Sequence, residues 1–219
     1  MMGLPRPGAV VCDLDGTLVD TVPTRIRAWR RTFAEFGIPA DRDHVSSLIG
    51  SDGKWLAEQV AARGDRTLSA EAAEAIDRRA GEIYGELNTE PRVLPGALAF
   101  VDALRSAGIP WAIATSSRPE QVSQSVAALG LPEQPVIVDG MQVSRAKPAP
   151  DLLLAAAEAL GTRPEACWCV GDSRWDVRAA TAAHMTPVGV ATGSATRDEL
   201  LADGAQVVVD RLDKLVDAL

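Results

Sequence analysis

The chain has 219 residues, of which 47% are hydrophobic and 24% are charged, and its formal net charge is −8. This size and composition predict a folded globule, and the acidic balance argues against nucleic acid as a partner. No apolar run approaches the roughly 18 residues of a membrane span, and residues 1–13 lack the basic start and long apolar stretch of a signal peptide. We therefore predict a cytoplasmic protein with no membrane partner. Its three cysteines lie in apolar, strand-like runs, which is typical of reduced core thiols: Cys12, Cys167 and Cys169.

The first part of the chain contains one predicted strand and then mainly helical sequence. Residues 9–13 (AVVCD) form a short β-branched run. Residues 22–36 carry apolar positions at helical spacing and stop at a glycine. Residues 41–63 and 69–88 continue as alanine- and charge-rich helical stretches, broken by Gly50, Gly53 and Gly64, with no clear strand between them. We therefore predict that residues 18–92 form a helical insert after the first strand.

From residue 95 onward, helical segments alternate with short apolar strands. Such alternation predicts an α/β fold with a parallel sheet covered by helices on both faces, and the first strand belongs to that sheet. The further strand-like segments are residues 109–115, 135–138, 166–170 and 186–190.

Polar residues follow several of these strands at the point where each one ends. In an open parallel sheet, ligands bind at the carboxyl ends of the strands, so these residues are predicted to converge. Each also has a local explanation, as a turn, a helix cap or an exposed lysine. None of those explanations accounts for their common position at one end of the sheet. The residues are Asp13, Asp15, Thr115, Ser116, Ser117, Lys147, Asp172 and Ser173, with Gly171 directly before Asp172 and Asp176 four residues after it.

A cluster of carboxylates calls for a cation, because each close pair costs roughly 4 kcal/mol at an intermediate dielectric. Oxygen ligands together with a substrate phosphate favour Mg²⁺, and neither His44 nor His184 stands beside a strand-end acid, which argues against zinc. A lysine and hydroxyl groups near such an ion suit a phosphoryl group. Asp13 is then the candidate nucleophile, and Asp15 is the candidate for moving protons.

Four motifs in order match a known family: DLDGT at 13–17, Thr115 with Ser116, Lys147 in KPAPD, and GDSRWD at 171–176. The chain resembles the haloacid dehalogenase (HAD) superfamily phosphatases from end to end, and within them the phosphoglycolate phosphatase and β-phosphoglucomutase branch. The resemblance implies a Rossmann-like core of residues 1–17 and 93–219 and a helical cap of residues 18–92. It also implies a Mg²⁺-dependent reaction on a small phosphorylated metabolite through an aspartyl-phosphate.

The resemblance further implies a role for each motif residue. Asp13 would be nucleophile and metal ligand, and Asp15 would be general acid and base with its main-chain carbonyl on Mg²⁺. Thr115 and the Ser116 amide would hold the phosphoryl group, and Lys147 would bridge the nucleophile and the phosphate. Asp172 would bind the metal, and Asp176 would be a further ligand or a support for the ligands.

Two other functions stay open at this point. A sugar-phosphate mutase of the same branch would carry Glu-Asp-Ser in the fourth motif and Gly four positions after the aspartate, where this chain has Gly171 and Asp176, the hydrolase pattern. A phosphoaspartate receiver module would need neither the second aspartate nor the insert. Specificity is expected to come from the cap, where Arg25 and Lys54 could meet the leaving group. The alternative for each of these two residues is a solvated surface charge.

Overall fold

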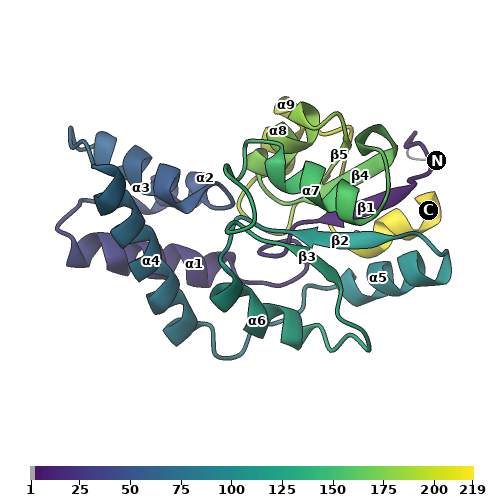
Figure 1. Ribbon diagram of the computed structural model, residues 1–219, viewed down its shortest axis with the longest axis horizontal. Coiled ribbons are helices and arrows are strands. Elements are labelled where there is room, and N and C mark those ends of the chain that lie inside the picture. Colours follow the sequence, from purple (N-terminus) through teal and green to yellow (C-terminus); the bar gives the residue numbers. More distant parts are fainter. Residues whose placement is uncertain (1–2) are drawn as a thin grey trace.

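Six parallel strands form a sheet in the order β3-β2-β1-β4-β5-β6, as the computed structural model of residues 3–219 shows (Figure 1). Each neighbouring pair is hydrogen-bonded in parallel register, for example Val11 opposite Ala112 on one side and Cys169 on the other. The sequence prediction of an α/β fold with a parallel sheet is therefore confirmed. The strands are β1 (Ala9–Cys12), β2 (Trp111–Ala114), β3 (Val136–Val138), β4 (Cys167–Gly171), β5 (Thr186–Val190) and β6 (Val207–Val209).

Helices cover both faces of the sheet because successive side chains of each strand point to opposite faces. Val10 and Cys12 of β1 lie in one core cluster, and Ala9 and Val11 lie in the other. The first cluster is covered by α5 (Ala97–Ser106), α6 (Pro119–Ala128) and the 3₁₀ helix η2 (Leu212–Ala218). The second is covered by α7 (Asp151–Ala159) and α8 (Arg174–Ala182).

The sixth strand was not among the predicted strands. β6 pairs with β5 at the edge of the sheet and follows α9 (Arg197–Ala202). Its signal was a run of three valines after a helical stretch, which continues the alternation of the preceding segments. The run is only three residues long, and short apolar runs are the hardest to assign from periodicity.

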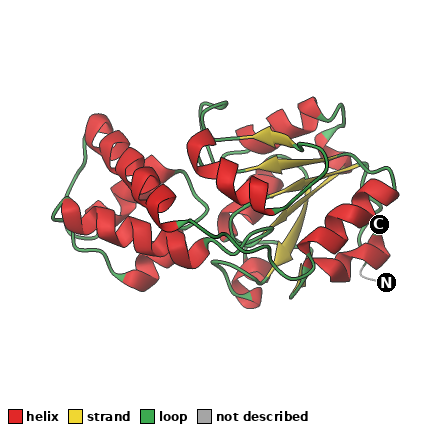
Figure 2. Cartoon of the chain, turned by 90° about the horizontal axis from the view of Figure 1, so that it is seen from below, coloured by secondary structure: helices red, strands yellow, loops and turns green. Residues whose placement is uncertain are grey.

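Four helices between β1 and α5 form a separate lobe beside the sheet (Figures 1 and 2). The predicted helical stretch 41–63 divides into two of them because Gly50 has a φ of 95° and Asp52 caps the next helix by accepting a hydrogen bond from the Trp55 amide. The helices are α1 (Val22–Glu35), α2 (Arg42–Leu48), α3 (Gly53–Ala62) and α4 (Ala70–Leu87).

The helical lobe has its own apolar core, which also receives one side chain from the sheet domain. Trp29 and Phe33 of α1 stack in that core with ring centroids 5.5 Å apart. Trp175 of α8 joins the same cluster and meets Trp55 edge to face, with centroids 5.0 Å apart. The Asp52 amide also donates to the main-chain oxygen of Lys147 (2.9 Å), so the lobe, called the cap below, is in contact with the sheet. The domain limits 17/18 and 92/93 stay a prediction.

The structure bears on two expectations, one about the cysteines and one about membrane-spanning segments. The three cysteines are buried and free, as predicted for core thiols. Among residues 3–219, no helix is both long and apolar enough to cross a membrane. The cytoplasmic location stays a prediction, and residues 1 and 2 of the predicted core domain lie outside the described residues.

Candidate active site

The predicted site residues meet at the carboxyl ends of the central strands, where parallel topology places strand ends on one edge. Asp13 directly follows β1, Thr115 follows β2, and Asp172 follows β4. Lys147 arrives from the loop before α7, and its Nζ lies 2.6 Å from Asp13 Oδ1 and 2.7 Å from Asp176 Oδ1. Residues more than 130 positions apart in the sequence are thus in direct contact.

Three buried carboxylates form the centre of this cluster. Asp13, Asp172 and Asp176 each contribute an oxygen, and these oxygens lie within 4.8 Å of one another. Burial raises the pKa of Asp13 to about 7 against the opposing effect of Lys147, and the charges of Asp176 and Asp15 add to the rise. Burial, followed by the charges of Asp13 and Asp176, also raises the pKa of Asp172 well above its usual range. This surplus of negative charge suits a divalent cation, which the three residues could hold.

Hydrogen bonds hold the carboxylates of Asp172 and Asp176 in place. Thr17 Oγ1 donates to Asp172 Oδ1 (3.0 Å), and the Ser194 amide donates to Asp172 Oδ2 (2.7 Å). Asp176 is the third residue of α8, where its Oδ2 accepts from the Ser173 amide (3.0 Å) in a capping box. Asp176 therefore stabilises the helix start and also contacts Lys147.

Close approach to Asp172 requires glycine on two loops. A Cβ on Gly16 would lie 2.6 Å from Asp172 Oδ2, and one on Gly193 would lie 1.9 Å from the same atom. Gly16 also has a φ of 87°, a conformation that favours glycine. The glycine after the two aspartates of the first motif therefore has a structural reason, beyond its place in a turn.

Asp15 has different hydrogen-bond partners from Asp13, and one of them belongs to the cap. Its Oδ1 accepts from Thr21 Oγ1 (2.5 Å), and its Oδ2 accepts from Ser117 Oγ (2.9 Å) and Arg25 Nη2 (2.8 Å). Burial alone would raise the pKa of Asp15, but the Arg25 charge and these hydrogen bonds outweigh burial and hold the pKa below its usual value. The surroundings of these two aspartates, which are two residues apart, thus shift their pKa values in opposite directions: the pKa of Asp13 is raised and that of Asp15 is lowered.

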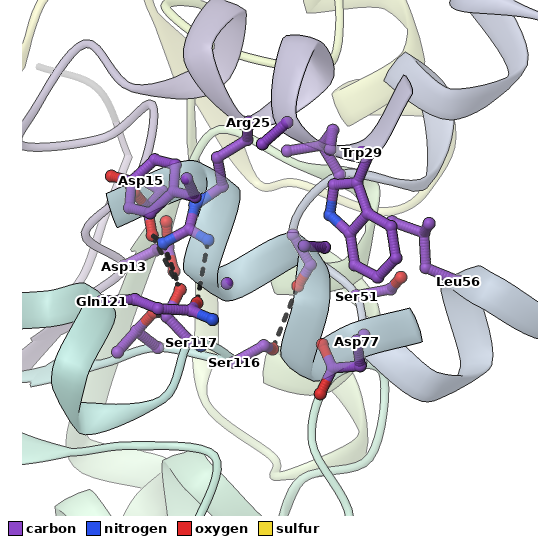
Figure 3. A pocket seen from close by; sticks show the side chains of 18 residues that line it. Asp13, Asp15, Arg25, Trp29, Ser51, Leu56, Asp77, Ser116, Ser117 and Gln121 are labelled. Carbon is purple, nitrogen blue, oxygen red and sulfur yellow. Dashed lines mark hydrogen bonds and ion pairs between the residues drawn. The ribbon is translucent and has the colours of Figure 1, made fainter. Parts of the chain in front are cut away.

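The hydroxyl motif after β2 is also in place. The Thr115 amide donates to the Val138 oxygen (3.0 Å), and Thr115 Oγ1 accepts from the Ser117 amide (3.1 Å). Ser116 Oγ donates to the main-chain oxygen of Gly50 in the cap (3.1 Å), a contact visible in Figure 3. The turn after β2 therefore connects the sheet to the cap.

Comparison with known proteins agrees with this arrangement. The haloacid dehalogenase-like hydrolase family matches residues 7–184. The chain belongs to this family. It is 32% identical over 204 residues to hexitol phosphatase A of Escherichia coli K12, covering 93% of this chain and 86% of that protein. It is also 32% identical to the phosphoglycolate phosphatase of Rhodospirillum rubrum, with 97% and 91% coverage. The crystal structure of a hydrolase from Pseudomonas syringae superposes with a TM-score of 0.91 at 30% identity, covering 95% and 96% of the two chains.

Membership of the HAD-like hydrolases confirms the prediction of a phosphatase of this family in the phosphoglycolate phosphatase-like branch. It also excludes the receiver module, which was the alternative from outside the enzyme class. The individual catalytic roles given to Asp13, Asp15, Thr115, Ser116, Lys147, Asp172 and Asp176 stay a prediction.

The two cap residues singled out from the sequence of this HAD-like hydrolase lie in different settings. The Arg25 side chain is only 11% exposed, and its guanidinium lies 3.9 Å from the Tyr84 ring centroid, so the alternative of a solvated surface charge is wrong for it. Lys54 is 51% exposed, lies 3.8 Å from Glu74, and is not among the residues that line the cavity beside Asp13. A role for either residue in specificity stays a prediction.

That cavity lies between the cap and the sheet of the enzyme, and sequence reasoning missed several of its residues (Figure 3). Its volume is about 50 Å³, far below the roughly 300 Å³ or more of a typical ligand site, so the cavity in this arrangement of cap and sheet is smaller than a typical ligand requires. The position of Arg25 had a sequence signal, because it stands three residues after Val22 and four before Trp29, which are both buried on the same face. Ser117 was among the polar residues expected at the strand ends, whereas the lining residues that the sequence did not suggest include Trp29, Ser51, Leu56, Asp77, Tyr84 and Gln121.

Proposed function

We propose that this protein is a Mg²⁺-dependent phosphomonoester hydrolase that acts on a small phosphorylated metabolite through an aspartyl-phosphate at Asp13. The observation that carries the proposal is the contact of Lys147 with Asp13, next to two further buried carboxylates and below a cap. Hydrolysis of a hexitol phosphate and of phosphoglycolate is named for two relatives, and both are small phosphate monoesters. The cap that covers this cavity supports a small metabolite in preference to a phosphoprotein, which would have trouble entering under it.

The donor set supports Mg²⁺ at the carboxylate cluster. Asp13, Asp172 and Asp176 offer oxygen atoms only, and one lysine cannot neutralise three buried carboxylates. When bound there, Mg²⁺ would supply positive charge for the phosphate oxygens and for the Asp13 carboxylate. Asp13 and Asp172 are the proposed ligands, and Asp176 is a further ligand or holds Lys147 in place.

In the first step, an oxygen of Asp13 attacks the phosphorus atom, and the bond from phosphorus to the leaving oxygen breaks. Asp15 gives a proton to that oxygen as it leaves. The Arg25 contact favours the charged form of Asp15, whereas the negative charge of an arriving phosphate favours the protonated form that Asp15 needs in this step. Lys147, the Thr115 hydroxyl and the Ser116 amide stabilise the charge on the transferring phosphoryl group.

In the second step, a water molecule attacks the phosphorus atom of the aspartyl-phosphate. Asp15, now a carboxylate, takes one proton from that water, and the bond between phosphorus and Asp13 breaks to release inorganic phosphate. The hydrogen bonds from Thr21 and Ser117 keep Asp15 oriented and charged for this role. The same side chain thus serves as acid and then as base.

The packing around Gly171 supports a hydrolase in preference to a mutase. A Cβ on Gly171 would lie 2.3 Å from both Cβ and Cγ of Asp176. An acidic residue at position 171, as in the mutase pattern, is therefore incompatible with Asp176 in its present place. Gly171 and Asp176 therefore depend on each other: the absence of a side chain at position 171 leaves the space that the Asp176 side chain fills.

The decisive experiment uses p-nitrophenyl phosphate, whose leaving group departs without a proton. Asp15→Asn is expected to release one equivalent of p-nitrophenolate in a burst and then stall, because the second step lacks its base. Acid quenching should then find phosphate covalently bound to the protein. Asp13→Asn is expected to show neither the burst nor the bound phosphate, and its melting temperature checks that it is folded.

Asp102→Asn is the matched control, since Asp102 lies on α5 and is exposed. It should turn over like the unmodified enzyme. Sustained hydrolysis by Asp13→Asn, or labelled phosphate bound to a different residue, would refute the proposed intermediate. Return of the phosphate to the sugar instead of its release would establish the mutase.

A further inference from the structure

The cavity under the cap contains charged side chains that are already paired with one another. Among the described residues lining it, Arg25 is the one cation, whereas three carboxylates face the same space: Asp13, Asp15 and Asp77. Arg25 Nη2 lies 2.8 Å from Asp15 Oδ2, so its charge is compensated before a substrate enters. A negatively charged leaving group would meet carboxylates there and no free cation.

A second guanidinium beside the cavity is also engaged. Arg118 precedes α6, and its Nη2 lies 2.7 Å from Asp77 Oδ2 and 2.6 Å from Glu74 Oε1. Its Nε donates to the same oxygen of Asp77 (3.1 Å). Both carboxylates belong to α4 of the cap, so this ion-pair cluster forms across the junction of cap and sheet domain. The cluster leaves Arg118 no free charge for a second anion.

We propose that the leaving group of the substrate is uncharged and hydroxylated, as in a small polyol or sugar monophosphate, with Asp77 as the residue that disfavours leaving groups carrying a carboxylate or a second phosphate. This rests on the proposed phosphomonoester hydrolysis and narrows its substrate class. It also sets the chain apart from an enzyme that must hold a bisphosphate, because both ends of such a substrate need cations.

The packing around Asp77 allows its carboxylate to reach the cavity. A Cβ on Gly53 would lie 1.9 Å from Asp77 Oδ1, so glycine at position 53 is needed for Asp77 to occupy this position. The other oxygen, Oδ2, accepts from Arg118. Figure 3 shows Asp77 beside the cavity, on the side away from Asp15 and Arg25. Asp77 therefore presents a carboxylate to a leaving group that occupies this cavity.

Neutral groups on the lining suit hydroxyls and carbon-bound hydrogens. Ser117 Oγ accepts from Arg25 Nη2 (2.6 Å), and Gln121 Oε1 accepts from Arg25 Nη1 (3.1 Å). A hydroxyl can replace either acceptor and can also donate a hydrogen bond to Asp77, whereas a carboxylate can only accept and has no proton to donate to Asp77. Trp29 and Leu56 add apolar surface for the carbon skeleton.

The test compares two substrates that differ at one end. Glycerol 3-phosphate ends in a neutral CH₂OH group, and 3-phosphoglycerate carries a carboxylate at the same carbon. We expect kcat/KM to be on the order of 100-fold higher for glycerol 3-phosphate. In Asp77→Asn, this ratio should fall to about tenfold or less, mainly because kcat/KM for 3-phosphoglycerate rises. The substitution removes a repelling charge, and Arg118 loses one of its two partners.

Two further variants keep the result interpretable. Asp102→Asn on α5 makes the same chemical change away from the cavity and should leave the ratio unaltered. If Asp77→Asn does not fold, Asp77→Ala removes the same charge, leaves Arg118 paired with Glu74 and should narrow the ratio as well. Equal or better hydrolysis of 3-phosphoglycerate by the unmodified enzyme would overturn this inference and leave the hydrolase standing. No phosphate release from either substrate or from p-nitrophenyl phosphate would overturn the proposed function itself.

Discussion

Replacing Lys147 with methionine removes a buried cation that contacts Asp13, the proposed nucleophile. Lys147 is 1% exposed, and its Nζ contacts Asp13, Asp176 and the Ala114 oxygen (2.7 Å). Methionine fills a similar volume, so the main effect is the loss of charge. Removing one partner of a buried ion pair costs about 3–5 kcal/mol, which for a chain of this size lowers the melting temperature by about 6–20 °C.

The same change should suppress catalysis by a separate route. Burial already raises the pKa of Asp13 to about 7, and Lys147 is the first factor that opposes the rise. Without the lysine, the pKa of Asp13 rises further, and a protonated Asp13 cannot attack phosphorus. We expect kcat/KM to fall by a factor on the order of 10³ at neutral pH, with the residual activity rising toward alkaline pH.

Urea unfolding and steady-state hydrolysis measure the two effects separately. Lys214→Met is the matched control, because Lys214 is exposed on η2 and should tolerate the change. The double variant Lys147→Met/Asp13→Asn should regain much of the lost stability, since it leaves one fewer buried carboxylate uncompensated, while staying inactive. A Lys147→Met protein as stable and as active as the Lys214→Met control would refute the reasoning.

Two further predictions concern the carboxylate cluster. Because burial raises the pKa of Asp13 from 3.8 to about 7, the unfolded chain releases this proton first, and Asp13 lowers the stability of the metal-free protein as pH rises through that window. Millimolar Mg²⁺, which binds the carboxylate form, should therefore raise the melting temperature more at about pH 8 than at about pH 5, and an equal rise at both would contradict this. Gly171→Glu should destabilise the protein by about 1–3 kcal/mol or more, since its Cβ would lie 2.3 Å from Asp176 Cβ. Adding Asp176→Gly should recover part of that loss in urea unfolding, and a double variant no more stable than Gly171→Glu would show that the two positions are independent.

The sequence by itself determined the sheet and the residues at its carboxyl edge. Five of the six strands could be predicted because they are short apolar runs that alternate with helices, and parallel topology then requires their ends to meet. Asp13, Thr115 and Asp172 could be grouped on this basis, since each directly follows a strand. The contact of Lys147 with Asp13 agrees with the same rule, although Lys147 comes from a loop.

Only the tertiary structure decided how the cap meets that edge. Periodicity identifies a helix and its buried face, but it does not fix how one lobe is oriented on another. The pairing of Arg25 with Asp15, 10 residues apart, and of Arg118 with Asp77, 41 residues apart, depends on that orientation. The sequence around an arginine or lysine does not show whether its side chain will form an ion pair or stay in solvent. Its partner depends on how segments that are distant in the sequence pack together. For this reason the phosphatase family could be predicted from its motifs, whereas the ion pairs of Arg25 and Arg118 beside the cavity could be seen only in the fold.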